Sequence, residues 1–331
     1  MLVKKILKKI IIKICRICGF EIIDQNQFVF PSLNNKNFNN LSTINKKSIV
    51  MPLGEVKISR KVEKLSIIVR TNSNVHISDQ NKKRIFNKDK SDYIQKSLNS
   101  LVVSINLFKK KFINFEINLT IVDQSDNKTI SSIFDKIFSK LDFKPNIIQF
   151  DKNELKSEIN LDFNKDVFGN LSSLLKCFKL AKNNESDLVF FLEDDYLHKK
   201  TLIEEMILTY ERISSQTNQE LILVPSDYPF LYMNERSTKV LTGSHRHWQT
   251  LDKVLCSFMT SKKMLDTYWD NFLLTCQDHN DPIEKHLNEI CEKEICLSPI
   301  PSLSVHMANS NSMFGISPYI DVKEEWEINK D

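Results

Sequence analysis

The chain has 331 residues, of which 41% are hydrophobic and 27% are charged, and its formal net charge is +4. This is the composition of a globular protein that is long enough for one large domain or two small ones. The sequence has no run of about 18 uninterrupted apolar residues, which argues against a membrane-spanning helix. The seven cysteines are an odd number in a long chain, which argues against a disulfide framework.

Residues 1–23 predict a basic amphipathic helix that contains "MLVKKILKKIIIKICRICGF". Apolar residues recur there at helical spacing, and most of the lysines fall on the other side. Such a helix can lie in the headgroup plane of an anionic membrane leaflet, so residues 1–20 predict peripheral membrane contact. The alternative is a helix that packs on the domain and exposes its lysines. Nucleic acid is not an expected partner, because the remaining chain shows no basic stripe with interleaved aromatic residues.

Residues 24–62 are rich in Asn and lack periodicity, so they predict a linker or irregular loops. Residues 63–315 predict one domain, in which short apolar runs alternate with helical patterns. The expected strands are "LSIIVRTNS", "INLTIVDQSDN", "NIIQF" and residues 188–192, and the expected helices are 91–111, 128–140, 169–182 and "TLIEEMILTYERI". This order predicts an α/β fold with a mostly parallel sheet flanked by helices. Residues 316–331 are expected to be a solvated tail.

Three predicted strands end in polar or acidic residues, at Arg70-Thr71-Asn72, at Asp123 and at Glu193-Asp194-Asp195. Because the carboxyl ends of parallel strands share an edge, where ligands bind in such sheets, these ends are expected to meet.

The last of these strand ends, in "DLVFFLEDDY", carries three consecutive acids. Adjacent carboxylates repel one another and lose solvation there, which is costly without a compensating cation. A divalent metal supplies that compensation, and carboxylate oxygens suit Mg²⁺ or Mn²⁺. Because side chains on a strand alternate, Glu193 and Asp195 are expected on one side and Asp194 on the other. The alternative is an acidic loop that caps the following helix.

These segments occur in the order seen in nucleotide-sugar glycosyltransferases of the GT-A (Rossmann-like) fold, and residues 63–312 resemble the family 2 type. The resemblance implies that Thr71 and Asp123 hold the nucleotide. The Asp-x-Asp motif of that fold maps onto Glu193-Asp194-Asp195. It implies Asp195 and Glu193 as metal ligands, and Asp194 and Glu193 as residues that bind the nucleotide-sugar. This copy departs from the motif by its first residue, Glu193, which leaves open whether that side chain touches the metal, a water or the ribose.

The segment "PSLSVH" resembles the Pro-Ser-Leu-x-x-His run that ends many GT-A domains. The resemblance implies that His306 completes the metal or diphosphate site. An imidazole ligand suits Mn²⁺ better than Mg²⁺. The alternative is a structural histidine at a strand end.

Two further clusters are candidates for the acceptor side of such a site. His245, Arg246, His247 and Trp248 combine an aromatic face with a guanidinium, which suits a sugar or phosphate pocket. The alternative is a surface turn with a partly buried Trp.

In "CQDHNDPIEKHLNEIC", Asp281 and Pro282 predict a helix start. Inverting GT-A enzymes resembling this chain place their general base at such a position, so the resemblance implies Asp281 as the base, ahead of Asp278 and Glu284. General-base catalysis needs a carboxylate within hydrogen-bond reach of the acceptor hydroxyl. The alternative is that Asp281 only caps the helix.

The function expected from the resemblance is that of a metal-dependent, inverting glycosyltransferase of the hexosyl or N-acetylhexosaminyl type. Its expected donor is a nucleotide sugar, with a UDP-sugar favoured, and its expected acceptor is a cell-surface glycan or a lipid-linked molecule. The expected location is the cytoplasm, at the inner face of the membrane. The alternatives are a sugar nucleotidyltransferase, and a non-catalytic glycan- or membrane-binding protein on a degenerate GT-A scaffold.

Overall fold

The structure is a computed structural model that describes residues 2–20, 47–50, 54–74, 85–125, 128–159, 165–277, 282–308, 310 and 312–329. It divides into two units, Met1–Ile58 and Ser59–Asp331. In the part of the chain that the structure describes, no helix is both long and apolar enough to cross a membrane.

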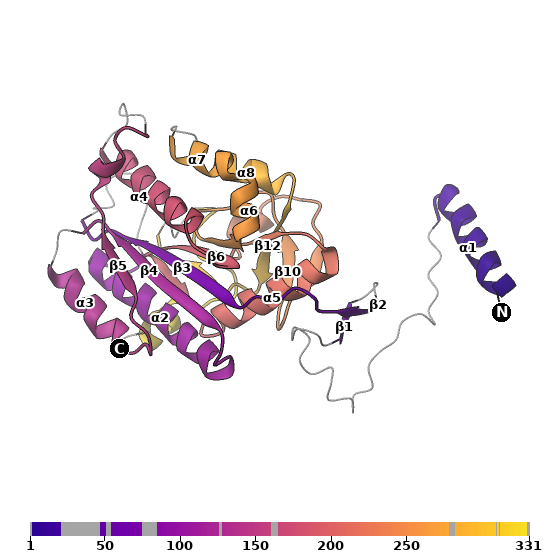
Figure 1. The fold of residues 1–331 in the computed structure, drawn as a ribbon, viewed down its shortest axis with the longest axis horizontal. Helices are drawn as coiled ribbons and strands as arrows, with labels where there is room; N and C mark the ends of the chain where they lie inside the picture. Colours follow the sequence, from indigo (N-terminus) through magenta and orange to yellow (C-terminus); the bar gives the residue numbers. More distant parts are fainter. Residues whose placement is uncertain are drawn as a thin grey trace. The chain divides into compact units, whose positions relative to one another are not determined.

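The first unit contains a helix and a short hairpin (Figure 1). Helix α1 (Leu2–Ile17) confirms the predicted N-terminal helix. Strands β1 (Lys47–Val50) and β2 (Gly54–Lys57) pair antiparallel within the stretch that the sequence predicts to be irregular. Strands of four residues are too short to show a clear alternation, so the sequence pattern did not reveal them.

The second unit is built on a nine-stranded sheet with the order β5-β4-β3-β6-β11-β8-β12-β10-β9 (Figure 1). Its strands are β3 (Lys64–Thr71), β4 (Glu116–Asp123), β5 (Asn146–Gln149), β6 (Leu188–Glu193), β8 (Leu221–Leu223), β9 (Val240–Thr242), β10 (His247–Thr250), β11 (Phe258–Ser261) and β12 (Ile295–Ile300). Strands β11 and β10 run against all the others. A separate antiparallel ribbon joins β7 (Tyr196–His198) to β13 (Ser304–His306). The predicted α/β class is confirmed, with a mixed sheet.

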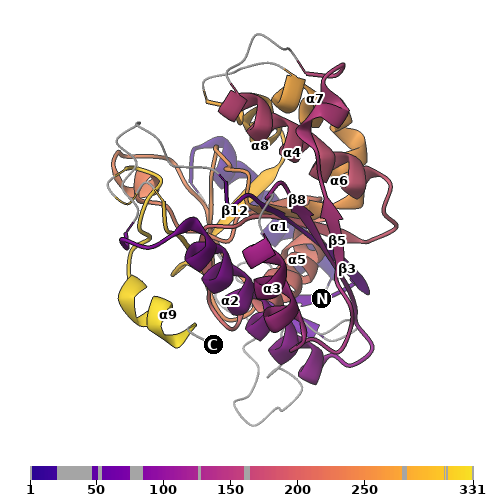
Figure 2. The ribbon, with the colours of Figure 1, turned by 90° about the vertical axis from the view of Figure 1, so that its left-hand side faces the viewer.

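Helices cover both faces of the sheet (Figure 2). They are α2 (Lys90–Lys111), α3 (Lys128–Phe138), η3 (Lys152–Leu155), α4 (Lys165–Lys182), α5 (Leu202–Thr217), η4 (Pro229–Tyr232), α6 (Lys262–Thr267), α7 (Trp269–Gln277), α8 (Lys285–Cys291) and α9 (Val322–Ile328). Side chains of α2, α3 and α5 share one apolar cluster, and side chains of α4, α6, α7 and α8 share another. Successive side chains of β3 point to opposite faces of the sheet, so Leu65 and Ile67 belong to the first cluster and Ile68 belongs to the second.

The carboxyl ends of β3, β4 and β6 meet at one edge of the sheet, as the sequence predicts. The parallel register pairs Thr71 with Asp123 and Arg70 with Glu193. Strand β6 ends at Glu193, and residues 194 and 195 form a turn before β7. The polar ends of the three strands are therefore neighbours.

Two boundary predictions need correction. Helix α4 begins at Lys165, so Gly169 lies inside the helix and does not open it. The segment 316–331 is not a simple solvated tail, because α9 buries Trp326 against the rings of Phe86 and Tyr93. A single Trp among charged residues gives too little periodicity to reveal such a docked helix.

We expect the Glu211→Gln variant to change the pH dependence of stability. Glu211 on α5 is 5% exposed and accepts a hydrogen bond from Val62 N at 3.0 Å. Burial raises its pKa to about 8, although the Val62 N–H opposes the shift. Because the folded state then holds a proton that the unfolded state releases from about pH 4.5 upward, this group lowers the free energy of unfolding as pH rises toward 8.

The Gln variant removes that contribution, and its free energy of unfolding should fall less steeply between pH 5 and 8, by up to about 1.4 kcal/mol per pH unit. Urea unfolding at several pH values measures the difference. If the unfolding free energies of the two proteins changed with pH in parallel across this range, the Glu211 carboxyl would not be the cause of the pH dependence.

Candidate functional site

The ends of β3 and β4 are tied together by side-chain hydrogen bonds. Thr71 Oγ1 donates to Asp123 Oδ1 at 2.7 Å, and both residues are buried. One residue further on, Asn72 Nδ2 donates to Gln124 Oε1 at 3.2 Å. The backbone N of Ser73 donates to Ser125 Oγ at 2.8 Å. The two residues that the sequence assigns to the nucleotide, Thr71 and Asp123, are thus in direct contact at a fixed polar edge.

Each acid of the triplet has its own set of partners. Glu193 forms an ion pair with Arg70, its register partner on β3. Asp194 Oδ2 accepts from the backbone N of Asn72 at 2.9 Å, and Asp194 Oδ1 accepts from Lys90 Nζ at 2.6 Å. Glu193 and Asp194 therefore have different partners. The predicted pairing of Glu193 with Asp195 on one side is wrong, because the strand ends at Glu193 and both aspartates lie near Lys90.

Asp195 lies in the turn after the strand and faces a histidine from the far end of the chain. Its Oδ1 is 3.5 Å from His306 Nε2, and its Oδ2 is 3.8 Å from Lys90 Nζ. The backbone N of Met307 donates to Asp195 O at 2.9 Å. Asp195 Oδ1 is buried and makes no hydrogen bond with any described residue. The structure thus brings Asp195 and His306 together, and their role as metal ligands stays a prediction.

The ring of His306 is held on both sides. It stacks on Tyr196 with ring centroids 4.7 Å apart. Its Nδ1 is 3.2 Å from the carbonyl oxygen of Phe314. A carbonyl can only accept, so Nδ1 carries the proton and donates, and Nε2 points at Asp195.

The three charged groups respond differently to burial. Burial raises the pKa of Asp194 although Lys90 opposes the rise. Burial also acts to raise the pKa of Asp195, but the ammonium of Lys90 and the imidazole of His306 hold it well below its usual range. Burial acts to lower the pKa of His306, and the Asp195 carboxylate outweighs it, so that pKa is raised. Asp195 is therefore the firmly ionised carboxylate of the adjacent pair.

Sequence reasoning missed two members of this site, Arg70 and Lys90. The sequence predicts a cation beside the acids, and the chain itself supplies two from β3 and from the first residue of α2. The side chain of Lys90 is only 10% exposed. The strand register could have indicated that Arg70 lies beside Glu193, because β3 and β6 end together. No pattern in the sequence indicates Lys90, because its position depends on how α2 crosses the sheet.

The cluster at residues 245–248 follows β9 and is organised by Glu205, a buried carboxylate on α5. Glu205 accepts from Trp248 Nε1 at 3.2 Å and from His245 N at 2.8 Å. Trp248 is fully buried, and a Cβ added at Gly243 would lie 2.3 Å from its indole nitrogen. The Trp248 ring therefore offers no exposed face for stacking.

The other two members of the cluster lie at its surface. Arg246 Nη1 donates to Pro301 O at 2.8 Å, and His247 is exposed on β10. No contact described in the structure joins these residues to the Asp195–His306 pair. An acceptor role for residues 245–248 stays a prediction.

Of the three predicted bases, Asp278 and Asp281 lie outside the described residues. Glu284 is described, at the start of α8, where the Cys256 thiol donates to its Oε1 at 3.4 Å. Burial raises the pKa of Glu284, and the Glu193 carboxylate adds to the rise. Glu284 thus lies within electrostatic range of the acidic triplet.

The structure also shows a carboxylate that the sequence analysis did not single out. Asp227 follows β8, whose carboxyl end points to the same edge as those of β3 and β6. It is fully buried and accepts from Tyr232 Oη at 2.6 Å and from Gln249 Nε2 at 3.0 Å. In the sequence it stands in a Pro-rich loop, where an Asp is most often a turn residue.

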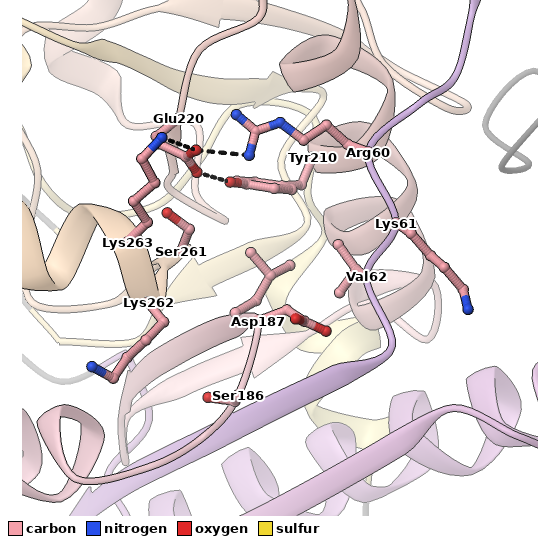
Figure 3. A pocket seen from close by; sticks show the side chains of 11 residues that line it. Arg60, Lys61, Val62, Ser186, Asp187, Tyr210, Glu220, Ser261, Lys262 and Lys263 are labelled. Carbon is pink, nitrogen blue, oxygen red and sulfur yellow. Dashed lines mark hydrogen bonds and ion pairs between the residues drawn. The ribbon is translucent and has the colours of Figure 1, made fainter.

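A cavity of about 260 Å³ lies at the opposite edge of the sheet, beside the starts of β3 and β6 (Figure 3). Arg60, Tyr210 and Lys263 line it, and Glu220 bonds to all three. Ligands of such sheets bind at the carboxyl ends of the strands, and the titratable cluster is there. We therefore place the functional site at the Asp195 edge, away from this cavity.

No protein-family model matches the sequence, and no curated protein gives a significant match to it. Solved structures do resemble it. TarS 1–349 of S. aureus has 15% identity over 62% of this chain and 48% of its own, with a TM-score of 0.34. TarS 1–349 in complex with UDP has 12% identity over 64% of this chain and 54% of its own, with a TM-score of 0.36. Galactosyltransferase LgtC in complex with donor and acceptor sugar analogues has 10% identity over 70% and 72%, with a TM-score of 0.36. The chain thus spans about half the length of the TarS chain that it matches.

We expect Lys90→Met to destabilise the protein strongly. Lys90 pairs with Asp194 at 2.6 Å and lies 3.8 Å from Asp195, and its loss leaves buried charge without compensation. Breaking a buried pair from one side costs about 3–5 kcal/mol of unfolding free energy. Urea unfolding in the presence of a chelator measures the loss.

Lys111→Met is the matched control on the same helix. Its side chain is 60% exposed and pairs with Glu204 at 2.7 Å. An exposed pair contributes about 1 kcal/mol or less. Equal losses in the two variants would contradict the assignment of Lys90 as the compensating cation.

Proposed function

We propose that the chain is a metal-dependent, inverting glycosyltransferase that moves a sugar from a nucleotide-diphosphate donor to an acceptor hydroxyl. The observation that carries the proposal is the pair formed by Asp195 and His306. A buried carboxylate oxygen that makes no hydrogen bond to the described chain faces an imidazole nitrogen at 3.5 Å. This pair lies at the strand edge where Thr71 and Asp123 are joined. The polar strand ends suit a nucleoside, and the neighbouring carboxylate and imidazole suit a metal ion bound to its diphosphate.

The donor atoms of this pair fit a divalent metal. A metal-binding histidine commonly donates its other ring N–H to a carbonyl, as His306 does to Phe314. Among the described residues, no group of three or more His, Cys, Asp or Glu side chains is placed so that it could hold a metal ion. Mg²⁺ and Mn²⁺ need no such group, because they take waters and substrate phosphates as further ligands. Asp195 and His306 would hold the ion, and Glu193, whose Oε1 is paired with Arg70, is the third candidate ligand.

Such an ion supplies Lewis-acid stabilisation of the diphosphate as it gains negative charge. The chain's own residues provide the rest of the site. Lys90 lies beside both aspartates, so its ammonium adds positive charge where a diphosphate would lie. Thr71 and Asp123 are assigned to the nucleoside. We favour a UDP-sugar of the hexosyl or N-acetylhexosaminyl type as donor, and a cell-surface glycan or lipid-linked molecule as acceptor.

A second candidate is a non-catalytic glycan- or membrane-binding protein on the same scaffold. One observation favours it, because Arg70, Lys90 and His306 already compensate the three acids. The triplet is therefore stable without a metal. The two candidates differ in whether a metal and a nucleotide bind at all.

The proposal predicts that Mn²⁺ and UDP together raise the midpoint of thermal unfolding. Ligand at about 100 times its dissociation constant stabilises the folded state by about 2.7 kcal/mol. Asp195→Asn should abolish the Mn²⁺-dependent part of the shift. In parallel, a screen of UDP-glucose, UDP-galactose and UDP-N-acetylglucosamine should reveal Mn²⁺-dependent release of UDP. NMR of the first-formed sugar anomer tests inversion.

Asp266→Asn is the control, because that exposed carboxylate pairs with Lys182 and Lys262 at the surface and with no other side chain among the described residues. It should keep both the shift and the turnover. No shift and no turnover in the parent protein would favour the non-catalytic scaffold.

Helix α1 supports a location at the inner face of the membrane, which we also propose. Its described apolar side chains are exposed along one face, at Leu7, Ile10, Ile11, Ile14 and Ile17. The first 20 residues contain no acid, and their lysines complement an anionic surface. A helix with these two faces fits a leaflet of anionic lipid, and this would bring the protein to a lipid-linked acceptor in the cytoplasm.

We expect the full chain to pellet with vesicles of phosphatidylglycerol and phosphatidylcholine, and less with phosphatidylcholine alone. The double variant Ile10→Asn and Ile14→Asn should bind about 10²–10⁴-fold more weakly, because each buried Ile contributes about 1.5–3 kcal/mol. High salt should also weaken binding. Binding that is equal for both vesicle types, or unchanged in the variant, would indicate that α1 packs on protein instead.

A further inference from the structure

A short strap after β8 holds a buried carboxylate against an exposed tyrosine. The strap comprises residues 225–232 and ends in the 3-10 helix η4 (Pro229–Tyr232). Tyr232 is 50% exposed, and its Oη donates to Asp227 Oδ2 at 2.6 Å. Gln249 Nε2 lies 3.0 Å from Asp227 Oδ1 and 3.1 Å from Tyr232 Oη. The half-exposed side chain of Tyr232 therefore ends in a hydroxyl that is bonded to the buried carboxylate.

This strap adjoins the Asp195–His306 pair. Tyr228 Oη is 2.8 Å from the Oη of Tyr196, whose ring stacks on His306. Phe230 packs on Phe314 with ring centroids 5.3 Å apart, and Phe314 O is the partner of His306 Nδ1. Tyr228 and Phe230 lie between Asp227 and Tyr232 in the strap, and they contact the neighbours of the proposed metal pair.

We propose that Tyr232 and Asp227 carry away the proton of the acceptor hydroxyl, in place of Asp281 and Asp278. The inference rests on the proposed function. The acceptor oxygen forms a bond to the anomeric carbon while the bond from that carbon to the diphosphate oxygen breaks. The diphosphate leaves with the electron pair. The acceptor proton passes to Tyr232 Oη, and the proton of Tyr232 passes to Asp227 Oδ2.

The surroundings of Asp227 suit this role. It makes no ion pair with a described residue, and the groups that face it are Tyr232 and Gln249, with Arg236 at longer range. Burial raises its pKa to about 6, although both hydrogen bonds and Arg236 oppose the rise. Such a carboxyl is ionised at neutral pH and still basic enough to accept a proton. Burial and the same carboxylate raise the pKa of Tyr232, so the phenol keeps its proton for the relay.

A purely structural role does not account for the charge. An Asn at position 227 could accept from Gln249 and could hydrogen-bond to Tyr232 without placing an unpaired charge in the interior. Burying a carboxylate without a cation is costly. Sites that keep such a group are candidates for proton transfer.

The test compares Tyr232→Phe and Asp227→Asn with the parent protein. The measurement is release of UDP, with water as acceptor, from whichever of UDP-glucose, UDP-galactose and UDP-N-acetylglucosamine the parent turns over. Both variants should lose about 10²–10⁴ in kcat, the usual contribution of general acid–base catalysis, with the donor KM unchanged. Parent activity should fall as pH drops below about 6, and Asp227→Asn should lack this dependence.

Tyr268→Phe is the matched control, because the Oη of Tyr268 also donates to a carboxylate, Glu294 Oε1 at 2.7 Å, and lies outside the strap. It should keep full activity. Asp227→Asn should retain the Mn²⁺ and UDP thermal shift and should not lower the unfolding midpoint at pH 7.5, whereas a structural carboxylate would. In protein labelled with ¹³C at the tyrosine ring, the Tyr232 signal should titrate near pH 6 in the parent and not in Asp227→Asn.

The outcomes separate this inference from the proposed function. If the parent releases UDP and Tyr232→Phe keeps full kcat, the relay is wrong and the proposed function stands. If Asp227→Asn alone loses activity, Tyr232 is not a carrier and the relay is again wrong. If the parent neither binds Mn²⁺ and UDP nor turns over any donor, both proposals fail together.

Discussion

The charge balance around Glu193, Asp194 and Asp195 is the constraint on which the site depends. Three acids at the end of a buried strand need compensation, and it comes from Arg70 on β3, Lys90 on α2 and His306 on β13. These cations come from three separate parts of the chain, so the acids are stable only when the second unit is folded as a whole. Removing one partner leaves buried charge behind, which costs more than the pair contributes. The site therefore forms only when the whole edge of the sheet is correctly packed.

The two aspartates differ in how their oxygens are bonded, and we relate this difference to the function that we propose. Asp194 uses both oxygens, one on Asn72 N and the other on Lys90. Asp195 keeps one buried oxygen without a hydrogen bond to the described chain, opposite an imidazole whose other nitrogen is already engaged. Buried polar atoms are nearly always satisfied, and the exceptions need an explanation. In the function that we propose, a metal bound together with a diphosphate would satisfy this oxygen when the donor is present.

The sequence predicted those features that follow from strand periodicity and failed where tertiary packing decides. Apolar runs ending in polar residues placed Thr71, Asp123 and the acidic triplet at one edge, and the register of β3 with its neighbours confirms this. Lys90 could not be found, because nothing local shows that the first residue of α2 turns toward Asp194. Trp248 illustrates the converse. A loop composition typical of a sugar pocket proved to include a fully buried ring held by Glu205, a partner 43 positions away.

Two carboxylates near this edge have opposite surroundings, and that contrast is what allows them different tasks. Asp195 is faced by Lys90 and His306, which keep it ionised and suit it to hold a cation. Asp227 is faced by neutral donors, Tyr232 and Gln249, with Arg236 only at longer range, and burial keeps its affinity for a proton high. When neighbouring environments push the proton affinities of two acids apart, one stays ionised and the other can accept a proton, so the two suit different tasks. The positions of Asp195 and Asp227 in the sequence do not indicate these different surroundings. The difference arises only from the side chains that the fold places around each carboxylate.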